Sequence, residues 1–126
     1  MAQNGLDVLL VDDEEEFVRT LAQRLDLRGI TCRVALNGES GLRMIEERAP
    51  DVVLLDLHMP GLTGLDVLER IRSGHPGVGV IMLTGHEAAQ DGLDAVRLGA
   101  FDSMTKPLSI DKLTARISEA AKAART

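Results

Sequence analysis

Aromatic side chains are almost missing from this sequence. Its 126 residues include two phenylalanines, no tryptophan and no tyrosine. A hydrophobic core must therefore be built from aliphatic side chains, and neither indole nor phenol rings are present to stack on a flavin. A chain of this length fits one domain that can bury a core of its own.

Cysteines and long apolar runs are also scarce. Cys32 is the only cysteine, so a disulfide within the chain is impossible, and we expect it to be a small buried residue. No apolar run approaches the roughly 18 residues that a membrane span needs, and the first residues do not resemble a signal peptide. We therefore expect a cytoplasmic protein that does not associate with membranes.

Positive charge is in deficit. The chain has 14 lysines and arginines against 20 aspartates and glutamates, a net charge of −6. A nucleic-acid-binding surface needs clustered basic residues, so direct nucleic-acid binding is not expected. The excess of acid is compatible with a metal cation or a protein partner.

The strongest apolar runs are short and do not alternate with polar residues. They cover residues 8–11, 52–55 and 80–83, and two weaker strands are predicted at 31–36 and 102–105. Continuous runs of this length are typical of parallel strands that are covered on both faces. Five strands are therefore predicted.

Between these strands the apolar residues recur at helical spacing. The five sets are Phe17, Leu21 and Leu25; Leu42, Ile45 and Ala49; Leu65, Leu68 and Ile71; Leu93 and Val96; and Leu113, Ile117 and Ala121. Ser109 is a suitable N-cap for the last helix. Five strand–helix repeats predict a doubly wound α/β sandwich of three layers, (βα)5, with a parallel sheet. We expect one domain over residues 1–126, with a core from about 6 to 121 and no output domain.

A polar residue follows four of the five strands. Asp12 and Asp13 follow the first strand, Asp56 the third, Thr84 the fourth and Lys106 the fifth. If the strand order is 2-1-3-4-5, these four strands are neighbours. Ligands of such sheets bind beyond the carboxyl ends of the strands, so the five side chains should meet in one pocket.

Three carboxylates in one pocket repel one another unless a cation or a proton intervenes. Oxygen ligands of this kind suit Mg²⁺ or Mn²⁺. A carboxylate can also be a nucleophile that forms an aspartyl-phosphate, and phosphoryl transfer needs positive charge around the phosphoryl oxygens. A metal ion, Lys106 and the Thr84 hydroxyl would supply that environment for Asp56.

Several motifs then resemble one known family, in order and at matching spacing. They are 10–14 (LVDDE), 56–61 (DLHMPG) with Gly64, 82–85 (MLTG), 99–102 (GAFD) and 106–107 (KP). Together they resemble the receiver domains of response regulators in two-component signalling, over nearly the whole chain. The resemblance implies a flavodoxin-like fold with strand order 2-1-3-4-5.

The resemblance also implies a role for each site residue. Asp56 would accept a phosphoryl group from a sensor histidine kinase or a histidine phosphotransfer protein. Asp13, Asp56 and the backbone carbonyl of His58 would ligate Mg²⁺ (or Mn²⁺) directly, and Asp12 largely through water. The protein would not be an enzyme beyond catalysing its own phosphoryl transfer and autodephosphorylation.

The remaining implied roles concern the switch. Lys106 would neutralise the phosphoryl charge, Thr84 would move inward to it, and Pro107 would follow a cis peptide. Side chains at His58 and His86 would border the path of the attacking water. The regulated face would be the fourth helix, fifth strand and fifth helix, acting on a separate effector protein or relaying phosphate.

Two features leave alternatives open. Ser103 stands where the family usually has tyrosine or phenylalanine, so the usual coupling of the threonine to an aromatic ring is in doubt. A pseudo-receiver, which binds partners without being phosphorylated, is the alternative function. Asp102 and Arg116 fall where some receivers form salt bridges between subunits, which implies a monomer or a weak phosphorylation-dependent dimer.

A haloacid-dehalogenase-type phosphatase also uses a nucleophilic aspartate after a strand. It would need a second aspartate where this chain has His58. A dinucleotide fold would need a glycine-rich loop where the acidic run begins at Asp12. Both of these functions are therefore disfavoured.

Overall fold

A computed structural model describes residues 5–85 and 89–125 of the chain. Five parallel strands form one sheet in the order β2-β1-β3-β4-β5. The strands are β1 (Asp7–Val11), β2 (Thr31–Ala35), β3 (Val52–Asp56), β4 (Gly79–Thr84) and β5 (Asp102–Thr105). All five predicted strands and the expected strand order are confirmed.

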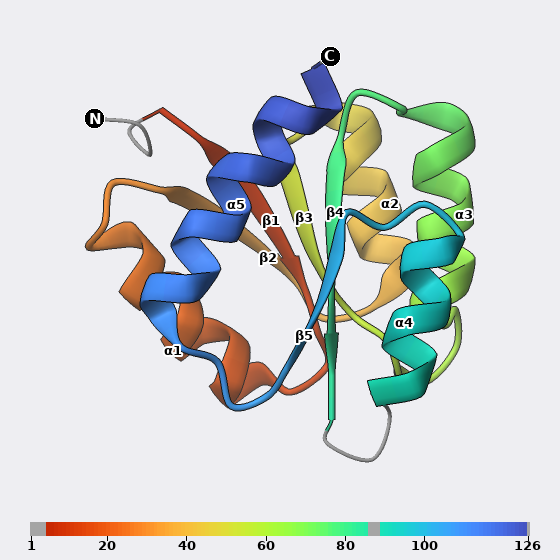
Figure 1. Ribbon diagram of the computed structural model, residues 1–126, viewed down its shortest axis with the longest axis horizontal. Coiled ribbons are helices and arrows are strands. Elements are labelled where there is room, and N and C mark those ends of the chain that lie inside the picture. The colour runs from red at the N-terminus through yellow and green to blue at the C-terminus, as the bar shows by residue number, and fades with distance from the viewer. Residues whose placement is uncertain (1–4, 86–88, 126) are drawn as a thin grey trace.

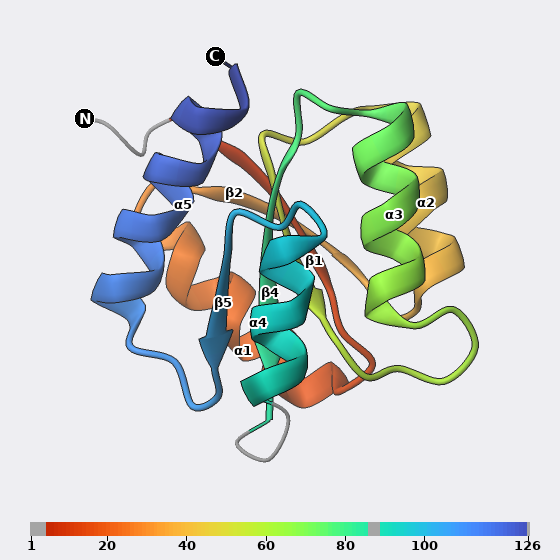
Figure 2. The ribbon, with the colours of Figure 1, turned by 45° about the vertical axis from the view of Figure 1, so that its right-hand side comes forward.

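Five helices complete the alternation. They are α1 (Glu15–Asp26), α2 (Gly38–Glu47), α3 (Gly64–Gly74), α4 (Ala89–Arg97) and α5 (Ile110–Arg125). Helices α1 and α5 cover one face of the sheet, and α2, α3 and α4 cover the other (Figures 1 and 2). The predicted three-layer, doubly wound architecture is confirmed. Across the described residues, no helix has the length and apolar character to cross a bilayer.

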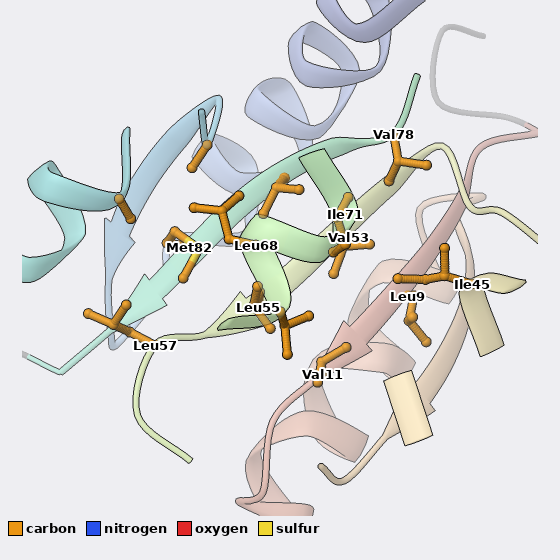
Figure 3. Packing of buried hydrophobic residues seen from close by; sticks show 14 of the residues in the cluster. Leu9, Val11, Ile45, Val53, Leu55, Leu57, Leu68, Ile71, Val78 and Met82 are labelled. Carbon is orange, nitrogen blue, oxygen red and sulfur yellow. The ribbon is translucent and has the colours of Figure 1, made fainter. Parts of the chain in front are cut away.

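The core is aliphatic and lies on both sides of the sheet. On the side of α2, α3 and α4, Leu9 and Val53 of the strands pack with Ile45, Leu68 and Ile71 of the helices (Figure 3). A second cluster fills the space beneath α1 and α5. Burial on both faces explains why the strands read as unbroken apolar runs rather than as alternating ones.

Two helix expectations were wrong in detail. Helix α2 ends at Glu47, and Ala49 lies exposed beyond it, because the residue before Pro50 is disfavoured in helical conformation. In α4, Leu93 is 56% exposed, and the buried face is formed instead by Gly92 and Ala95. These small residues bring the α4 backbone close to the sheet.

The segment after β3 is held tightly against the start of α3. Thr63 and Asp66 form a reciprocal capping box that begins the helix. A Cβ atom at Gly64 would lie 2.5 Å from the backbone oxygen of Asp56 and 2.7 Å from the Cα of Leu57. Only glycine allows this approach, so the first turn of α3 fixes the loop that follows Asp56.

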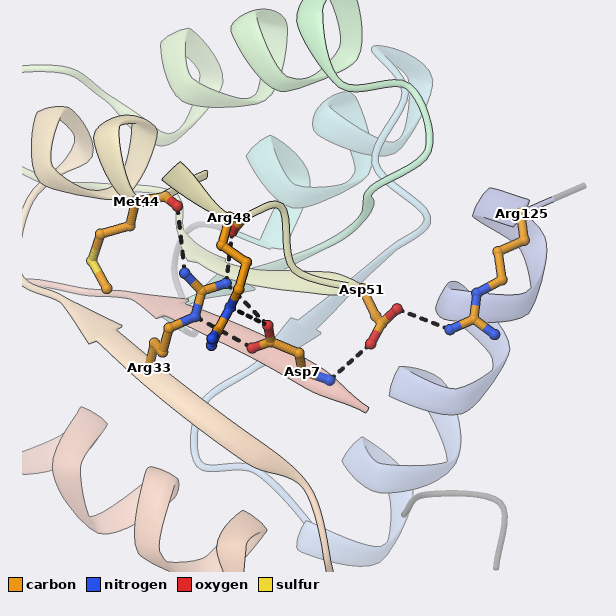
Figure 4. A network of polar contacts seen from close by, with 6 residues as sticks. All are labelled: Asp7, Arg33, Met44, Arg48, Asp51 and Arg125. Atoms are coloured by element: carbon orange, nitrogen blue, oxygen red, sulfur yellow. Dashed lines mark hydrogen bonds and ion pairs between the residues drawn. The ribbon is translucent and has the colours of Figure 1, made fainter. Parts of the chain in front are cut away.

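A network of ion pairs lies at the amino-terminal ends of the strands, opposite the carboxyl ends where the predicted site residues lie (Figure 4). The Asp7 carboxylate contacts Arg33 at 3.2 Å and Arg48 at 3.3 Å. The Asp7 backbone N–H donates to Asp51, which also pairs with Arg125 at 2.9 Å. These contacts tie α2 and α5 to β1 and β3, and the carboxyl edge is left for the polar residues identified from the sequence.

Candidate functional site

The carboxyl ends of the strands bring the predicted site residues together. Asp12, Asp56 and Thr84 are buried, with 1%, 7% and 0% of their surface exposed. Asp13 is exposed, and the Lys106 side chain is mostly buried. The open side is a pocket of about 470 Å³, whose walls are Asp13, Glu14, Asp56, His58, Gly85, Asp91 and Lys106.

Three carboxylates form a cluster suited to a cation. One oxygen each from Asp12, Asp13 and Asp56 lies within 4.8 Å of the other two. The backbone N–H of Glu14 donates to Asp12 Oδ1 at 2.9 Å, whereas Asp12 Oδ2 is buried without a hydrogen bond from any described residue. This buried oxygen has an ion pair with Lys106 but no hydrogen bond, and together with the two nearby carboxylates it fits a hard divalent ion.

The pKa of Asp56 is raised to about 7. Burial is the largest cause, and the neighbouring charge of Asp12 adds to it. Lys106 and a 3.4 Å hydrogen bond from the His58 backbone N–H oppose the shift. Without a cation, the Asp56 carboxyl group is therefore partly protonated at neutral pH.

Lys106 lies on the β1–α1 side of the pocket. Its Nζ is 2.9 Å from Asp12 Oδ2 and 2.6 Å from Glu14 Oε1, and it sits 4.4 Å from the centre of the Phe17 ring. Burial alone would lower the pKa of Lys106, but its hydrogen bond to Glu14 and the nearby negative charge of Asp12 raise it above the ordinary value. The 2.9 Å approach to Asp12 Oδ2 is an ion pair, and its geometry is poor for a hydrogen bond.

Thr84 and Ser103 lie beneath α4. The Thr84 hydroxyl is 3.5 Å from the Met104 carbonyl, a long hydrogen bond. A Cβ atom at Gly92 of α4 would lie 2.0 Å from Ser103 Oγ and 3.0 Å from Thr84 Cγ2. Helix α4 therefore rests directly on the Thr84 and Ser103 side chains.

The other expected residues have different outcomes. The Lys106–Pro107 peptide bond is cis, as predicted. The His58 side chain is exposed at the pocket mouth, with Nε2 3.4 Å from Asp91 Oδ2 of α4. His86 lies outside the described residues. Cys32 is only partly buried, not fully buried as expected, but its burial still raises the pKa of the thiol to about 12, which suits an unreactive structural cysteine.

Arg116 pairs with a carboxylate of its own chain. Its Nε donates to Asp102 Oδ2 at 2.8 Å, and its guanidinium lies 4.7 Å from the centre of the Phe101 ring. The two residues that the resemblance assigned to a subunit interface thus bond to each other within one chain. A weak dimer stays a prediction.

Sequence reasoning missed two residues that border the site. Asp91 reaches the pocket from the first turn of α4, and Phe17 packs against Lys106 from α1. The Phe17 position on the apolar stripe of α1 predicted burial and gave no sign of a contact with a lysine 89 residues away. No sequence spacing linked Asp91 to the loop after β3.

This fold, with an acidic pocket, a threonine and a lysine at the carboxyl edge of the sheet, defines a class of phosphoacceptor signalling domains. Residues 8–118 match the model of the response regulator receiver domain, and the chain belongs to that family. Receiver domains are components of two-component systems, and phosphorylation and Mg²⁺ binding are general features of the family.

Known relatives agree with this assignment. The chain is 39% identical over 113 residues to the uncharacterized transcriptional regulatory protein YkoG of Bacillus subtilis, covering 90% of this chain and 50% of YkoG. It is 36% identical over 118 residues to the DNA-binding transcriptional regulator NtrC of Escherichia coli, covering 94% of this chain and 25% of NtrC. The chain thus spans half or less of the length of these relatives.

Solved structures confirm the fold. A response regulator receiver domain protein from Clostridium thermocellum superposes with a TM-score of 0.88 at 32% identity, covering 94% of this chain and 95% of that one. The receiver domain of NtrX from Brucella abortus gives a TM-score of 0.82 at 36% identity, covering 94% and 98%.

Proposed function

We propose that Asp56 is the phosphoacceptor of this receiver and takes its phosphoryl group from a sensor histidine kinase or a histidine phosphotransfer protein. The observation that carries the proposal is the position of the Asp56 carboxylate. It ends β3, is buried beside Asp12 and Asp13, and lines an open pocket with Lys106. A nucleophile, a cation site and a fixed positive charge are thus adjacent.

The Asp12, Asp13 and Asp56 carboxylates and the His58 carbonyl would hold Mg²⁺ or Mn²⁺. Such an ion neutralises the carboxylate charges and those of the phosphoryl oxygens. The three clustered carboxylate oxygens support this ligand set.

In the transfer, an Asp56 oxygen attacks the phosphorus atom of a phosphohistidine. An oxygen–phosphorus bond forms as the phosphorus–nitrogen bond breaks, and the histidine nitrogen keeps the electron pair. Asp56 must be ionised to attack, which its pKa of about 7 permits at neutral pH. Lys106 and the Thr84 hydroxyl then pair with the phosphoryl oxygens.

The output face would be formed by α4, β5 and α5. The contact between Thr84 and α4 at Gly92 supports this, because an inward movement of Thr84 changes the surface on which α4 rests. Leu93 exposes an apolar side chain on α4, and a groove runs between Ser103 of β5 and Arg116 of α5. A separate effector protein, or relay of the phosphoryl group to another histidine, would read this face. That the receiver acts without an attached output domain stays a prediction.

The test is incubation with acetyl phosphate, with and without Mg²⁺, followed by intact mass spectrometry. We expect one added phosphoryl group that requires Mg²⁺ and is absent from Asp56→Asn. Asp26→Asn, an exposed carboxylate at the end of α1, is the matched control and should be modified like the wild type. No adduct in any condition, with Mg²⁺ binding intact, would favour the pseudo-receiver.

A further inference from the structure

The ammonium group of Lys106 is paired with residues that are not the phosphoacceptor. Within residues 5–85 and 89–125, its ion pairs shorter than 4.0 Å are those with Asp12 and Glu14. The Glu14 contact, at 2.6 Å, is the shorter of the two. Phosphoryl oxygens at Asp56 would therefore have to compete with these two carboxylates for the Lys106 ammonium group.

The position of Glu14 at the start of α1 places its carboxylate beside Lys106. Its backbone N–H is fixed by the hydrogen bond to Asp12 Oδ1, so its side chain starts from a defined position at the beginning of α1. From there it crosses to the lysine that follows β5. Phe17, almost one helical turn further along α1, places its ring against the same ammonium group.

The two carboxylates that hold Lys106 differ in their exposure. The Asp12 side chain is 1% exposed and stays in the cluster, whereas the Glu14 side chain is 62% exposed. Glu14 can give up its partner to solvent at little cost. Of the two contacts, the Glu14 contact is therefore the one that can open when a phosphoryl group arrives.

We propose that Glu14 is a positioning residue that holds Lys106 away from Asp56 in the unphosphorylated protein and thereby slows phosphorylation. The inference rests on the proposed function of Asp56. Glu14 acts through Lys106, because its carboxylate competes with the incoming phosphoryl oxygens for the same cation.

The chain offers a matched control for the substitution Glu14→Gln. Glu16 lies in the same first turn of α1, and it makes no ion pair with any described residue. Glu16→Gln therefore removes the same charge without touching Lys106. With acetyl phosphate and saturating Mg²⁺, Glu14→Gln should be phosphorylated about two to five times faster than Glu16→Gln, the range that an exposed ion pair supports. Equal rates for the two variants would overturn the proposal.

A second comparison tests whether the effect passes through Lys106. In a Lys106→Met background, phosphorylation should be slower, and Glu14→Gln should then give no acceleration. A gain that persists without the lysine would show that Glu14 acts on the anionic phosphodonor instead, and the proposal would be wrong.

A third measurement needs no phosphorylation. The ¹H–¹⁵N resonance of the Lys106 ammonium group, recorded without metal, should move in Glu14→Gln and stay in place in Glu16→Gln. An unmoved resonance would refute the Glu14 contact, whatever happens at Asp56. If the resonance moves and Asp56 is not phosphorylated in the wild type, the proposed function fails while the contact stands.

Discussion

Replacing Asp56 with asparagine should stabilise the metal-free protein at neutral and alkaline pH. The folded state raises the pKa of Asp56 from 3.8 to about 7. Each pKa unit corresponds to about 1.4 kcal/mol, so the buried carboxylate lowers the free energy of unfolding by up to about 4 kcal/mol once it is ionised. Asparagine has the same shape without the charge. We expect Asp56→Asn to gain about 2–4 kcal/mol at pH 8.

The pH dependence follows from the direction of the pKa shift. Below pH 3.8 the carboxyl group is protonated in both the folded and the unfolded state and contributes nothing. Between about pH 3.8 and 7 the unfolded chain loses this proton first, so the unfolding free energy falls by up to about 1.4 kcal/mol per pH unit. Above about pH 7 the carboxyl group is ionised in both states, and the unfolding free energy falls no further through this group. The advantage of Asp56→Asn should therefore be small near pH 4 and largest near pH 8.

Urea unfolding in EDTA across this pH range measures the difference directly. Asp26→Asn, at an exposed position, should show no comparable gain. Adding Mg²⁺ should stabilise the wild type by binding its folded state, and stabilise Asp56→Asn much less. An unfolding free-energy difference between Asp56→Asn and the wild type that does not change with pH would refute the assignment of the raised pKa to this carboxyl group.

Three further predictions test the structure around the site. Gly64→Ala should lower the unfolding free energy by more than about 3 kcal/mol in urea titrations, because its Cβ would lie 2.5 Å from the backbone oxygen of Asp56. Gly74→Ala is the control: its Cβ would enter open space, so it should change the unfolding free energy by less than about 0.5 kcal/mol. Thr84→Ala should still accept phosphate from acetyl phosphate, but its α4 amide resonances should shift less on addition of beryllofluoride than those of the wild type. Gly92→Ala should cost about 1–3 kcal/mol through overpacking, and Ser103→Ala in the same chain should recover much of that cost.

The sheet and most of the site residues could be predicted from the sequence. Each central strand is buried on both faces, which leaves an unbroken apolar run that ends at the point where a polar side chain is needed. Asp12, Asp56 and Thr84 therefore mark the ends of β1, β3 and β4 in the sequence itself. Parallel topology then places those ends at one edge.

Helix α4 could not be predicted in the same way. Leu93 and Val96 suggested the buried face by their hydropathy, yet Leu93 is exposed and Gly92 and Ala95 face the sheet. Glycine and alanine contribute little to a hydrophobic pattern. A helix that packs on the sheet through such small residues therefore shows its largest apolar side chains on the wrong face. The partners of Lys106 were hidden for another reason: they depend on side-chain distances across the pocket, which no sequence spacing encodes.

The close packing of α4 against the sheet is related to the presence of Ser103 where the family usually has an aromatic residue. A tyrosine or phenylalanine there would need space that the α4 backbone occupies, since even a Cβ at Gly92 would lie 2.0 Å from Ser103 Oγ. The same Cβ would approach Thr84 Cγ2 to 3.0 Å, so glycine lets helix and threonine meet without an intervening ring. A rotation of the Thr84 side chain must then change its contact with α4 directly. If so, Gly92→Ala should alter the α4 response to beryllofluoride while leaving phosphorylation of Asp56 intact, and an unchanged response would show that the contact is packing alone.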